Sequence, residues 1–314
     1  MSQPVVSVVI VSYGTRDLTL AALESVRRRR QEVDLDVVVV DNASPDDSAD
    51  AVEREHPWVT LVRAEENRGF AAGANLGARS TVGEWLLFLN SDARLTNHAI
   101  TRLLVAAQSL QHAGAVGPRI EGPDGTERSV GRYYGPWRDF VRAFYLYRLF
   151  PRWGVFEDVH LRRLPGETTP VEWVSGACLL VRREVFEEIR GFDEAYFLYV
   201  EDMDLCYRLA RAGRTNLYVP AAVINHEGAS SPRANSKVFA EGGRAAEIFV
   251  QKTGMRYPVA CQRSLRALTL LRWMGVLGSR ILRKRLRSQS TEATWASFRL
   301  CRRSLAAVFS RKYE

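Results

Sequence analysis

The sequence predicts an α/β fold: a mostly parallel sheet flanked by helices, followed by a helical, basic C-terminal extension. Over the first 120 residues, short β-branched apolar runs alternate with amphipathic segments, which favours parallel strands joined by right-handed crossovers. Polar residues directly follow several of these runs, and beyond Lys237 the spacing is helical and arginine is frequent. A chain of 314 residues has room for one large domain and an appendage.

The first half of the chain is predicted to alternate between strands and helices. The strands are expected at Val5–Ser12, Asp34–Val40, Val59–Val62, Glu84–Leu89 and Ala115–Gly117. The helices are expected at Asp17–Arg30, Phe70–Arg79 and Ala99–Gln111, with another beginning near Ser44. Ser44 is followed by Pro45 and two acids, so we expect Ser44 to be the N-cap of that helix.

The second half is less regular. Asp124-Gly125 predicts a hairpin turn. We expect strands at Trp173–Val181 and Leu217–Ile224, and helices at Glu184–Ile189 and at Asp202–Arg211, the latter ending at Gly213. The segment Tyr133–Phe156 is rich in aromatic residues and arginine without a clear period. It is typical of domain packing, and a loop that covers a bound molecule is the alternative.

Charge is distributed unevenly. The net charge is +8, but residues 255–314 hold fourteen Lys or Arg and two Glu, about +12, so the remainder carries about −4. This asymmetry indicates an anionic partner for residues 260–314, either nucleic acid or a lipid surface. Arginines interrupt the apolar run Ser264–Leu282, which favours a helix in the membrane interface over a spanning one. The alternative is that these helices pack on the main domain or form an oligomer contact.

Cysteine usage and the N-terminus indicate a reduced, cytoplasmic setting. The four cysteines lie far apart, without zinc spacing, so we expect no disulfide framework. The first residues lack a basic leader and a cleavage site, so we expect no signal peptide.

Chemistry is predicted where polar residues follow apolar runs. Asn90-Ser91-Asp92, Glu201-Asp202-Met203-Asp204 and His226 all stand at such positions. One carboxylate with an imidazole can hold a divalent metal against a charged leaving group, while another carboxylate acts as a base. Each alone has a plainer explanation, as a helix cap, as acids at a helix N-terminus or as a structural histidine. Their ordered combination favours an enzyme.

The ordered motifs resemble those of family 2 glycosyltransferases of the Rossmann-like GT-A fold, particularly the bacterial rhamnosyltransferase-like members. The matching pieces are Ser7–Tyr13, Val40–Ser44, Asn67–Phe70, Leu89–Asp92, Gly176-Ala177, Gly191–Glu194, Glu201–Cys206, and His226 with Gly228. Together they cover roughly residues 5 to 230. Each motif is weak alone, but all of them in this order are specific.

The resemblance implies roles for individual residues. The donor nucleotide would be bound by Ser12, Tyr13, Asp41, Asn67, Gly69, Asn90 and Ser91. Within this set, Tyr13 would pack on the base and Asp41 would accept the ring N–H of a uracil or thymine. Asp92 and His226 would bind Mg²⁺ or Mn²⁺, Asp202 would be the catalytic base, and the acceptor would be bound by Trp173, Gly176 and Glu201. Asn90 stands where the family's Asp-x-Asp motif has its first acid, so the metal would depend more on diphosphate and water.

The resemblance implies a metal-dependent inverting hexosyltransferase that uses a dTDP- or UDP-sugar, with dTDP-L-rhamnose as the best match. The acceptor would be a glycan or a polyprenyl-diphosphate-linked glycan of the bacterial envelope. Residues 1–120 would form the nucleotide-binding half and 121–235 the acceptor-binding half of a catalytic domain. Residues 236–314 would form the tail, docking at the inner face of the plasma membrane, with no nucleic-acid partner.

Three other functions stay open. A nucleic-acid-binding protein would use the basic tail but would leave the polar strand ends unexplained. A catalytically silent glycan-binding relative would not need Asp92, Asp202 and His226. A nucleotidyltransferase would need a richer glycine and basic loop than Gly14-Thr15-Arg16.

Overall fold

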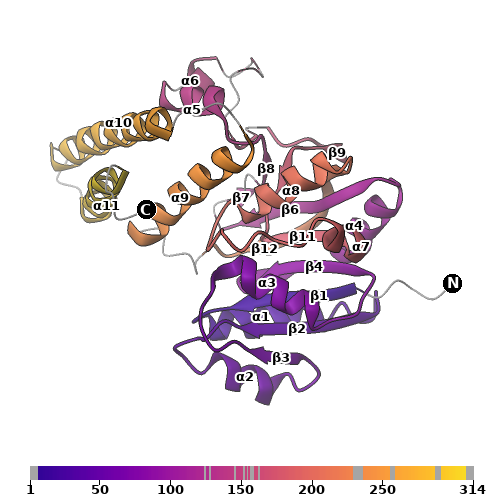
Figure 1. Ribbon diagram of the computed structural model, residues 1–314. Coiled ribbons are helices and arrows are strands. Elements are labelled where there is room, and N and C mark those ends of the chain that lie inside the picture. The colour runs from indigo at the N-terminus through magenta and orange to yellow at the C-terminus, as the bar shows by residue number, and fades with distance from the viewer. Residues whose placement is uncertain are drawn as a thin grey trace. The chain divides into compact units, whose positions relative to one another are not determined.

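The computed structural model describes residues 6–123, 125–126, 129–144, 146–150, 153, 155, 159–161, 163–228, 236–254, 259–286 and 291–308. The chain divides into two compact units (Figure 1). The first, which we call the sheet unit, comprises Met1–Tyr133 and His160–Ser230. The second, the helical unit, comprises Tyr134–Val159 and Ser231–Glu314.

The sheet unit is built around one ten-stranded mixed sheet. Its strands are β1 (Val6–Ser12), β2 (Leu35–Asp41), β3 (Thr60–Arg63), β4 (Trp85–Asn90), β5 (Ala93–Leu95), β6 (Ala113–Gly122), β7 (Gly125–Thr126), β9 (Thr169–Pro170), β11 (Cys178–Arg182) and β12 (Thr215–His226). The main order is β3-β2-β1-β4-β11-β6-β12-β5. β1 to β4 are parallel, and β12 is parallel to β6, while β11 runs antiparallel between β4 and β6. The predicted α/β class and mostly parallel sheet are confirmed.

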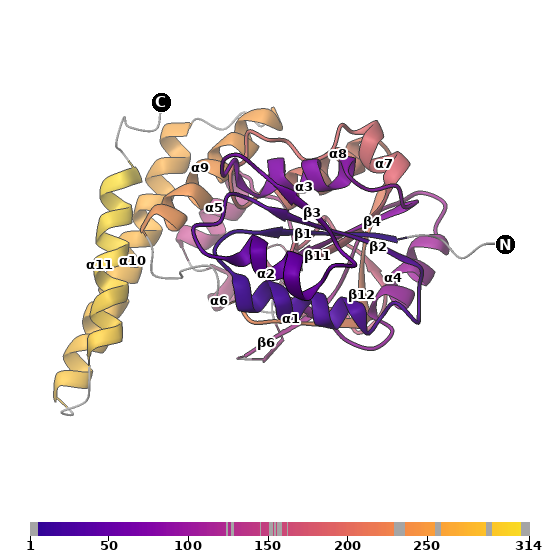
Figure 2. The ribbon, with the colours of Figure 1, turned by 90° about the horizontal axis from the view of Figure 1, so that it is seen from below.

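Helices cover both faces of this sheet (Figure 2). They are α1 (Arg16–Arg27), α2 (Ser48–Glu55), α3 (Gly69–Arg79), α4 (Ala99–Gln108), α7 (Arg183–Glu188) and α8 (Glu201–Arg211). In Figure 2, α1 and α4 lie on one face and α3, α7 and α8 on the other, while α2 packs against α1. The alternating side chains of β1 are therefore buried on both sides, as its unbroken β-branched run predicts.

Close packing of α3 on the sheet depends on its small residues. A Cβ added at Gly77 would lie 2.4 Å from a methyl of Val9, and one at Gly73 would lie 2.8 Å from a methyl of Val11. Alanine at either position would therefore push the helix off the strand. This contact fixes α3, whose first residue, Gly69, lies near the carboxyl ends of the strands.

The helix expected from Ser44 begins later, so Ser44 is not its N-cap. α2 starts at Ser48, whose backbone N–H donates to the Asp46 carboxylate, 3.2 Å away. Ser44 instead joins two strand-end loops: its hydroxyl accepts the Gly14 N–H at 3.0 Å, and its own N–H donates to Asp41 Oδ2 at 3.1 Å. The positive φ of Ala43, 59°, turns the chain before any helix can form.

The single strand expected at Trp173–Val181 is two strands. β10 (Trp173–Val174) pairs with β8 (Val130–Gly131) in a separate two-stranded sheet, and β11 begins at Cys178. Two backbone hydrogen bonds stabilise the chain between β10 and β11: Ser175 N–H donates to Ser129 O at 2.8 Å, and Asn90 N–H donates to Ala177 O at 3.0 Å. The alternating pattern of a strand in the sequence does not show where the chain leaves one sheet and joins another.

The predicted hairpin is confirmed by the pairing of β6 with β7, although Asp124 itself lies outside the described residues. The structure also adds the short strand β5, which the sequence pattern did not predict. It extends β6 well beyond its predicted bounds and β12 by two residues at each end. Short apolar runs such as Ala115–Gly117 carry too little periodicity to mark where a long strand begins and ends.

The helical unit contains α5 (Pro136–Ala143), α6 (Leu146–Leu149), α9 (Ser236–Lys252), α10 (Val259–Leu286) and α11 (Glu292–Val308). The predicted helicity beyond Lys237 is confirmed. α10 packs on α11 through Ala267, Leu270 and Val308, and on α5, where Arg272 Nη1 donates to Ala143 O at 2.7 Å. Residues 134–144 therefore pack with the basic tail. In the part of the chain that the structure describes, no helix is both long and apolar enough to span a bilayer.

Candidate active site

The carboxyl ends of β1, β2 and β4 bring the first group of predicted residues together. Ser12 pairs with Asp41, and Val11 pairs with Asn90, so these strand ends are neighbours at one edge of the sheet. Thr15 links them: its hydroxyl lies 3.2 Å from Ser12 Oγ and donates to Ser91 Oγ at 3.0 Å. This arrangement is the one expected for ligand binding beyond the carboxyl ends of parallel strands.

Asp41 is buried but only partly hydrogen-bonded. Its Oδ2 accepts the Ser44 N–H, whereas its buried Oδ1 has no hydrogen-bond partner among the described residues. A buried carboxylate oxygen without a donor is costly, so this atom is suited to accept a hydrogen bond from a ligand. Tyr13, in the adjoining loop, is 50% exposed and presents a ring face on which a planar group can pack.

Asn67 and Gly69 form a tight turn at the start of α3. Asn67 Oδ1 accepts the Gly69 N–H and the side-chain amide of Asn42, each at 2.9 Å. Gly69 has φ +88°, and a Cβ there would lie 2.2 Å from Phe197 O. Only glycine fits this position, and the same contact ties the 197 loop to the site through a Phe70 N–H to Phe197 O hydrogen bond.

Asp92 and His226 meet although they lie far apart in the sequence. Asp92 directly precedes β5, which runs antiparallel to the end of β12, so that Ala93 faces His226. His226 Nε2 lies 3.1 Å from Asp92 Oδ1, and the Glu227 N–H donates to Asp92 O at 3.0 Å. The carboxylate is buried. A carboxylate oxygen and an imidazole nitrogen, both of which can bind a metal ion, therefore lie side by side.

These two side chains fit a hard divalent cation that takes few protein ligands. Among the described residues, no group of three or more His, Cys, Asp or Glu is placed to hold a metal ion. A cation bound by Asp92 and His226 would therefore take its remaining ligands from substrate phosphates and water, as magnesium commonly does. Manganese accepts the same oxygen donors and the imidazole.

Asp202 lies at the same edge. It is in the first turn of α8, where its Oδ2 accepts the Gly176 N–H at 2.8 Å and its Oδ1 accepts the Met203 N–H at 2.7 Å. The next residue, Ala177, accepts the Asn90 N–H, so two hydrogen bonds and one peptide unit connect Asp202 to the strand end that carries Asp92. The break between β10 and β11 makes this connection, so Asp202 lies at the same edge of the sheet as Asp41, Asp92 and His226.

Burial perturbs the two acids that begin α8. It raises the pKa of Glu201 to about 8, and the neighbouring Asp202 charge adds to the rise. Burial also raises the pKa of Asp202, against the lowering effect of the N–H donors of Gly176 and Met203. The charge of Asp204, two residues further along α8, is not among the causes of this rise. Its carboxylate is 2.7 Å from Arg208 and accepts the Tyr196 hydroxyl, so it is already compensated.

The three residues predicted to bind the acceptor have different surroundings. Gly176 lies against the Asp202 side chain, and Glu201 Oε2 is buried without a partner among the described residues. Trp173 is 5% exposed, and its indole N–H donates to Arg132 O at 3.0 Å. A direct role in acceptor binding stays a prediction for all three.

Sequence reasoning assigned no role to two side chains that shape the site. Asn42 is buried, and its side-chain amide donates hydrogen bonds to Asn67 Oδ1 and to the Gly69 carbonyl. Thr15 joins the ends of β1 and β4. Asn42 lies inside the quoted motif Val40–Ser44, which could have indicated it, whereas a lone threonine in a loop carries no such signal.

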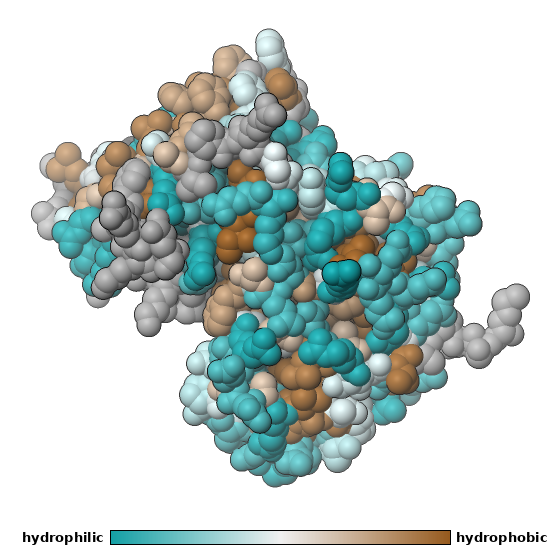
Figure 3. All heavy atoms as spheres, in the orientation of Figure 1, coloured by the Kyte–Doolittle hydropathy of each residue, from teal (hydrophilic) through white to brown (hydrophobic). Residues whose placement is uncertain are grey.

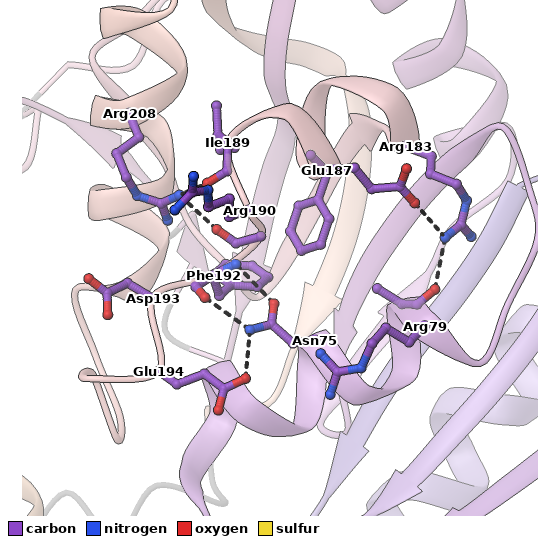
Figure 4. Close-up of a pocket in the computed structure, with 13 residues that line it drawn as sticks. Asn75, Arg79, Arg183, Glu187, Ile189, Arg190, Phe192, Asp193, Glu194 and Arg208 are labelled. Atoms are coloured by element: carbon purple, nitrogen blue, oxygen red, sulfur yellow. Dashed lines mark hydrogen bonds and ion pairs between the residues drawn. The ribbon is translucent and has the colours of Figure 1, made fainter.

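A cavity of about 580 Å³ lies elsewhere, between α3, α7 and α8 (Figure 4). Two of its lining arginines are engaged by the fold. Arg183 donates to the carbonyls of Ala78 and Gly83, and Arg208 to those of Ile189 and Gly191. Asn75 donates to Phe192 O and Glu194. These contacts fasten the loop at 189–194 to the helices and hold the α8 scaffold in place.

Fold and strand-end residues together define a transferase of the GT-A type, and sequence comparison gives its family. The family model described as Glycosyl transferase family 2 matches residues 7–190. The chain belongs to this family.

Two curated relatives are rhamnosyltransferases. The N-acetylglucosaminyl-diphospho-decaprenol L-rhamnosyltransferase of Mycobacterium tuberculosis is 34% identical over 226 residues, which are 68% of this chain and 74% of the relative. Rhamnosyltransferase WbbL of Escherichia coli is 32% identical over 144 residues, which are 44% of this chain and 50% of the relative.

Solved structures with similar folds are glycosyltransferases. The mannosyltransferase PcManGT of Pyrobaculum calidifontis, in complex with GDP-Man and Mn²⁺, has a TM-score of 0.59 at 18% identity, covering 98% of this chain and 86% of that one. GalNAc-T7, solved with UDP, GalNAc and Mn²⁺, has a TM-score of 0.58 at 18% identity, covering 79% of this chain and 48% of that one. These similarities confirm the GT-A fold.

Proposed function

We propose that this protein is an inverting glycosyltransferase that moves a sugar from a nucleoside diphosphate to a hydroxyl of a glycan acceptor. The observation that carries this proposal is the gathering of Asp41, Asp92, Asp202 and His226 at one edge of the sheet. Residues 1–120 would bind the nucleotide, and 121–235 would supply the base and much of the acceptor site.

Asp202 is the proposed base. Transfer with inversion requires one group to take the proton of the attacking hydroxyl and needs no nucleophile from the protein. Asp202 is half-buried, and burial raises the pKa of its carboxyl, so its basicity is greater than that of an exposed aspartate. The N–H groups of Gly176 and Met203 fix both of its oxygens, which leaves their remaining lone pairs to accept the proton.

Asp92 and His226 are the proposed ligands of Mg²⁺ or Mn²⁺. Such a cation supplies charge that stabilises the departing nucleoside diphosphate. The two side chains would hold and orient the diphosphate beside the sugar, and the Glu227 N–H fixes the Asp92 backbone for this purpose. Asn90, which lacks a charge, would leave the cation more dependent on the phosphates.

Asp41 and Tyr13 are the proposed nucleotide-base contacts. The buried Oδ1 of Asp41 needs a donor, and the ring N–H of uracil or thymine is such a donor. The exposed Tyr13 ring can pack on the same base. Ser12, Asn67, Gly69, Asn90 and Ser91 would complete the donor site.

L-Rhamnose from dTDP-rhamnose is the proposed donor sugar, and the proposed acceptor is a glycan on a polyprenyl diphosphate of the bacterial envelope. Two relatives that are at least 32% identical are rhamnosyltransferases, and one of them acts on a diphospho-decaprenol acceptor. A lipid-linked acceptor would place the protein at the inner face of the plasma membrane, on the surface of which the basic residues 260–314 would lie.

The test of this proposal is the Asp202→Asn variant. The amide keeps the size of the side chain but cannot take a proton, so we expect transfer to fall about 10²- to 10⁴-fold. Donor and Mn²⁺ affinity should remain within about twofold, because the variant leaves Asp41, Asp92 and His226 unchanged. Calorimetric titration with the nucleotide sugar and a radiolabelled-sugar transfer assay measure the two effects separately.

The matched control is Asp50→Asn. Asp50 is an exposed carboxylate that pairs with Arg63 on the surface of the sheet unit, so its loss should leave transfer unchanged. If Asp202→Asn weakens donor binding as much as it slows transfer, Asp202 belongs to the donor site and the proposed base is wrong.

A further inference from the structure

Exposed apolar side chains are concentrated in one short segment of the helical unit. Among the described residues from 136 to 155, seven large apolar side chains are exposed: Trp137, Phe140, Phe144, Leu149, Phe150, Trp153 and Val155. We call these residues the aromatic surface. The far longer sheet unit exposes only Tyr13, Val82, Val105 and Phe197 among its described residues. In the face seen in Figure 3, brown apolar residues are exposed over the helical unit. Such patches usually mark an interaction site.

The aromatic surface is an ordered array. Trp137 stacks on Phe140 with ring centroids 5.7 Å apart, and Phe140 lies 4.6 Å from Phe144. Trp137 donates its indole N–H to Val155 O at 2.7 Å, which fastens the start of α5 to the end of the segment. The rings thus support one another, and the folded unit holds them at the surface.

The opposite side of α5 explains why the rings face outward. Val141 and Ala143 are fully buried, and the Ala143 carbonyl accepts the hydrogen bond from Arg272 of α10. α5 therefore packs on the basic tail with its small residues and leaves its large ones exposed. The exposed rings are held on the same body as the excess of about twelve positive charges on residues 255–314.

Arginines also lie over two half-buried tyrosines of the same unit, which are not members of the aromatic surface. The Arg142 guanidinium is over the Tyr134 ring, 5.6 Å from its centroid, and that of Arg148 is over the Tyr147 ring at 5.9 Å. Aromatic rings next to arginine are typical of the membrane interface, where the ring enters the headgroup layer and the cation meets lipid phosphate.

We propose that the aromatic surface is the part of this protein that inserts into a lipid bilayer, and that the arginines of α10 and α11 attract it to anionic headgroups. A second copy of the chain is a poorer occupant, because pairing two strongly basic units brings like charges together. A glycan is also poorer, because sugar sites combine rings with several converging polar side chains. The biological purpose, access to a lipid-linked acceptor, rests on the proposed function, but the docking itself does not.

The experiment uses the full-length protein and sedimentation with phosphatidylcholine vesicles, with and without phosphatidylglycerol. We expect binding to the anionic vesicles that weakens with salt. The Leu149→Ser/Phe150→Ser variant should bind at least about tenfold more weakly, because two apolar side chains that would enter the bilayer are lost. Both positions are exposed, so folding should be unaffected. The control is Val105→Ser, an equally exposed apolar residue of α4, which should bind like the native protein.

A second measurement locates the insertion. Lipids brominated in the acyl chain should quench the tryptophan emission of the native protein more than that of Trp153→Phe. Equal vesicle binding by the native and Leu149→Ser/Phe150→Ser proteins would overturn the proposal. It would also be overturned if light scattering showed that the native protein is a dimer and that this variant is a monomer. Transfer to a water-soluble acceptor analogue should be unchanged in the variant, so failure of the docking proposal leaves the catalytic proposal standing.

Discussion

The strand-end site of the sheet unit and the aromatic surface of the helical unit have opposite polarity patterns. In the strand-end site, Asp41 and Asp92 at the ends of strands and Glu201 at the start of α8 are buried polar residues. In the helical unit, Phe144 and Trp153 are exposed while α5 buries small residues against α10. Both patterns cost free energy in the isolated protein.

The two regions differ in what offsets this free-energy cost. Neighbouring backbone groups satisfy the buried acids in part: Gly176 and Met203 serve Asp202, and Ser44 serves Asp41. Asp41 Oδ1 and Glu201 Oε2 have no hydrogen-bond partner among the described residues, and in the proposed function a substrate would supply one. Among the described residues of the helical unit, no side chain covers these rings enough to remove them from water, and in our proposal a bilayer would do so. Variants of the first region should therefore change chemistry, and variants of the second should change location only.

The largest effect that separates the two regions is expected from Asp92→Ala. If Asp92 is the metal ligand that we propose, its loss removes several kcal/mol of stabilisation from the departing diphosphate, so transfer should fall about 10²-fold or more at limiting Mn²⁺. His226→Ala should show a weaker version of the same metal dependence. Steady-state transfer rates measured over a Mn²⁺ titration give the loss of activity and its metal dependence for each variant.

The matched control for Asp92→Ala is Asp17→Ala, whose side chain is 92% exposed on α1. Activity that survives chelation in the native protein would remove the metal role of Asp92. A comparable loss of transfer to a soluble acceptor in Leu149→Ser/Phe150→Ser would abolish the distinction between the two regions.

A smaller effect, on stability as well as activity, is expected from Gly69→Ala. The added Cβ would lie 2.2 Å from Phe197 O at a φ of +88°, so the backbone must shift, at a cost of about 2–4 kcal/mol. Chemical denaturation should report this loss. Gly166→Ala, in open space, is the control, and a Gly69→Ala protein of native stability would mean that this turn is not tightly constrained.

The sequence predicted the fold and the position of the first polar groups because topology leaves little freedom. Parallel strands end at one edge, so Ser12, Asp41 and Asn90 had to be neighbours. The junction of Gly176 with Asp202 could not be predicted, because it depends on a strand that breaks and changes sheets. The packing of α5 on α10 could not be predicted from the sequence either. The two helices are far apart in the chain, and no sequence motif links Arg272 to Ala143, whose carbonyl accepts its hydrogen bond. The meeting of Asp92 with His226 was expected from family resemblance, and the periodicity alone did not predict it.

The smallest effect is expected from Glu201→Gln, and it appears in the pH dependence of stability. The native pKa of Glu201 is raised to about 8 from an ordinary value of 4.5. Between these values the native state keeps a proton that the unfolded chain has released, so this group makes stability fall as pH rises through that window. Glutamine does not titrate, and the buried Oε2 has no partner to lose among the described residues. The variant should match the native protein near pH 4 and exceed it by on the order of 2 kcal/mol near pH 9.

Thermal unfolding across this pH range measures the Glu201→Gln effect. Glu184→Gln, whose side chain is 80% exposed, should leave the native pH profile unchanged, and so should Leu149→Ser/Phe150→Ser. A parallel pH profile for Glu201→Gln would mean that the buried carboxyl ionises without penalty, and burial would then no longer distinguish the strand-end acids from those at the surface. A profile that flattens only in Glu201→Gln would show that Glu201 stays protonated next to Asp202, the proposed base, and that burying this carboxyl lowers the stability of the protein at high pH.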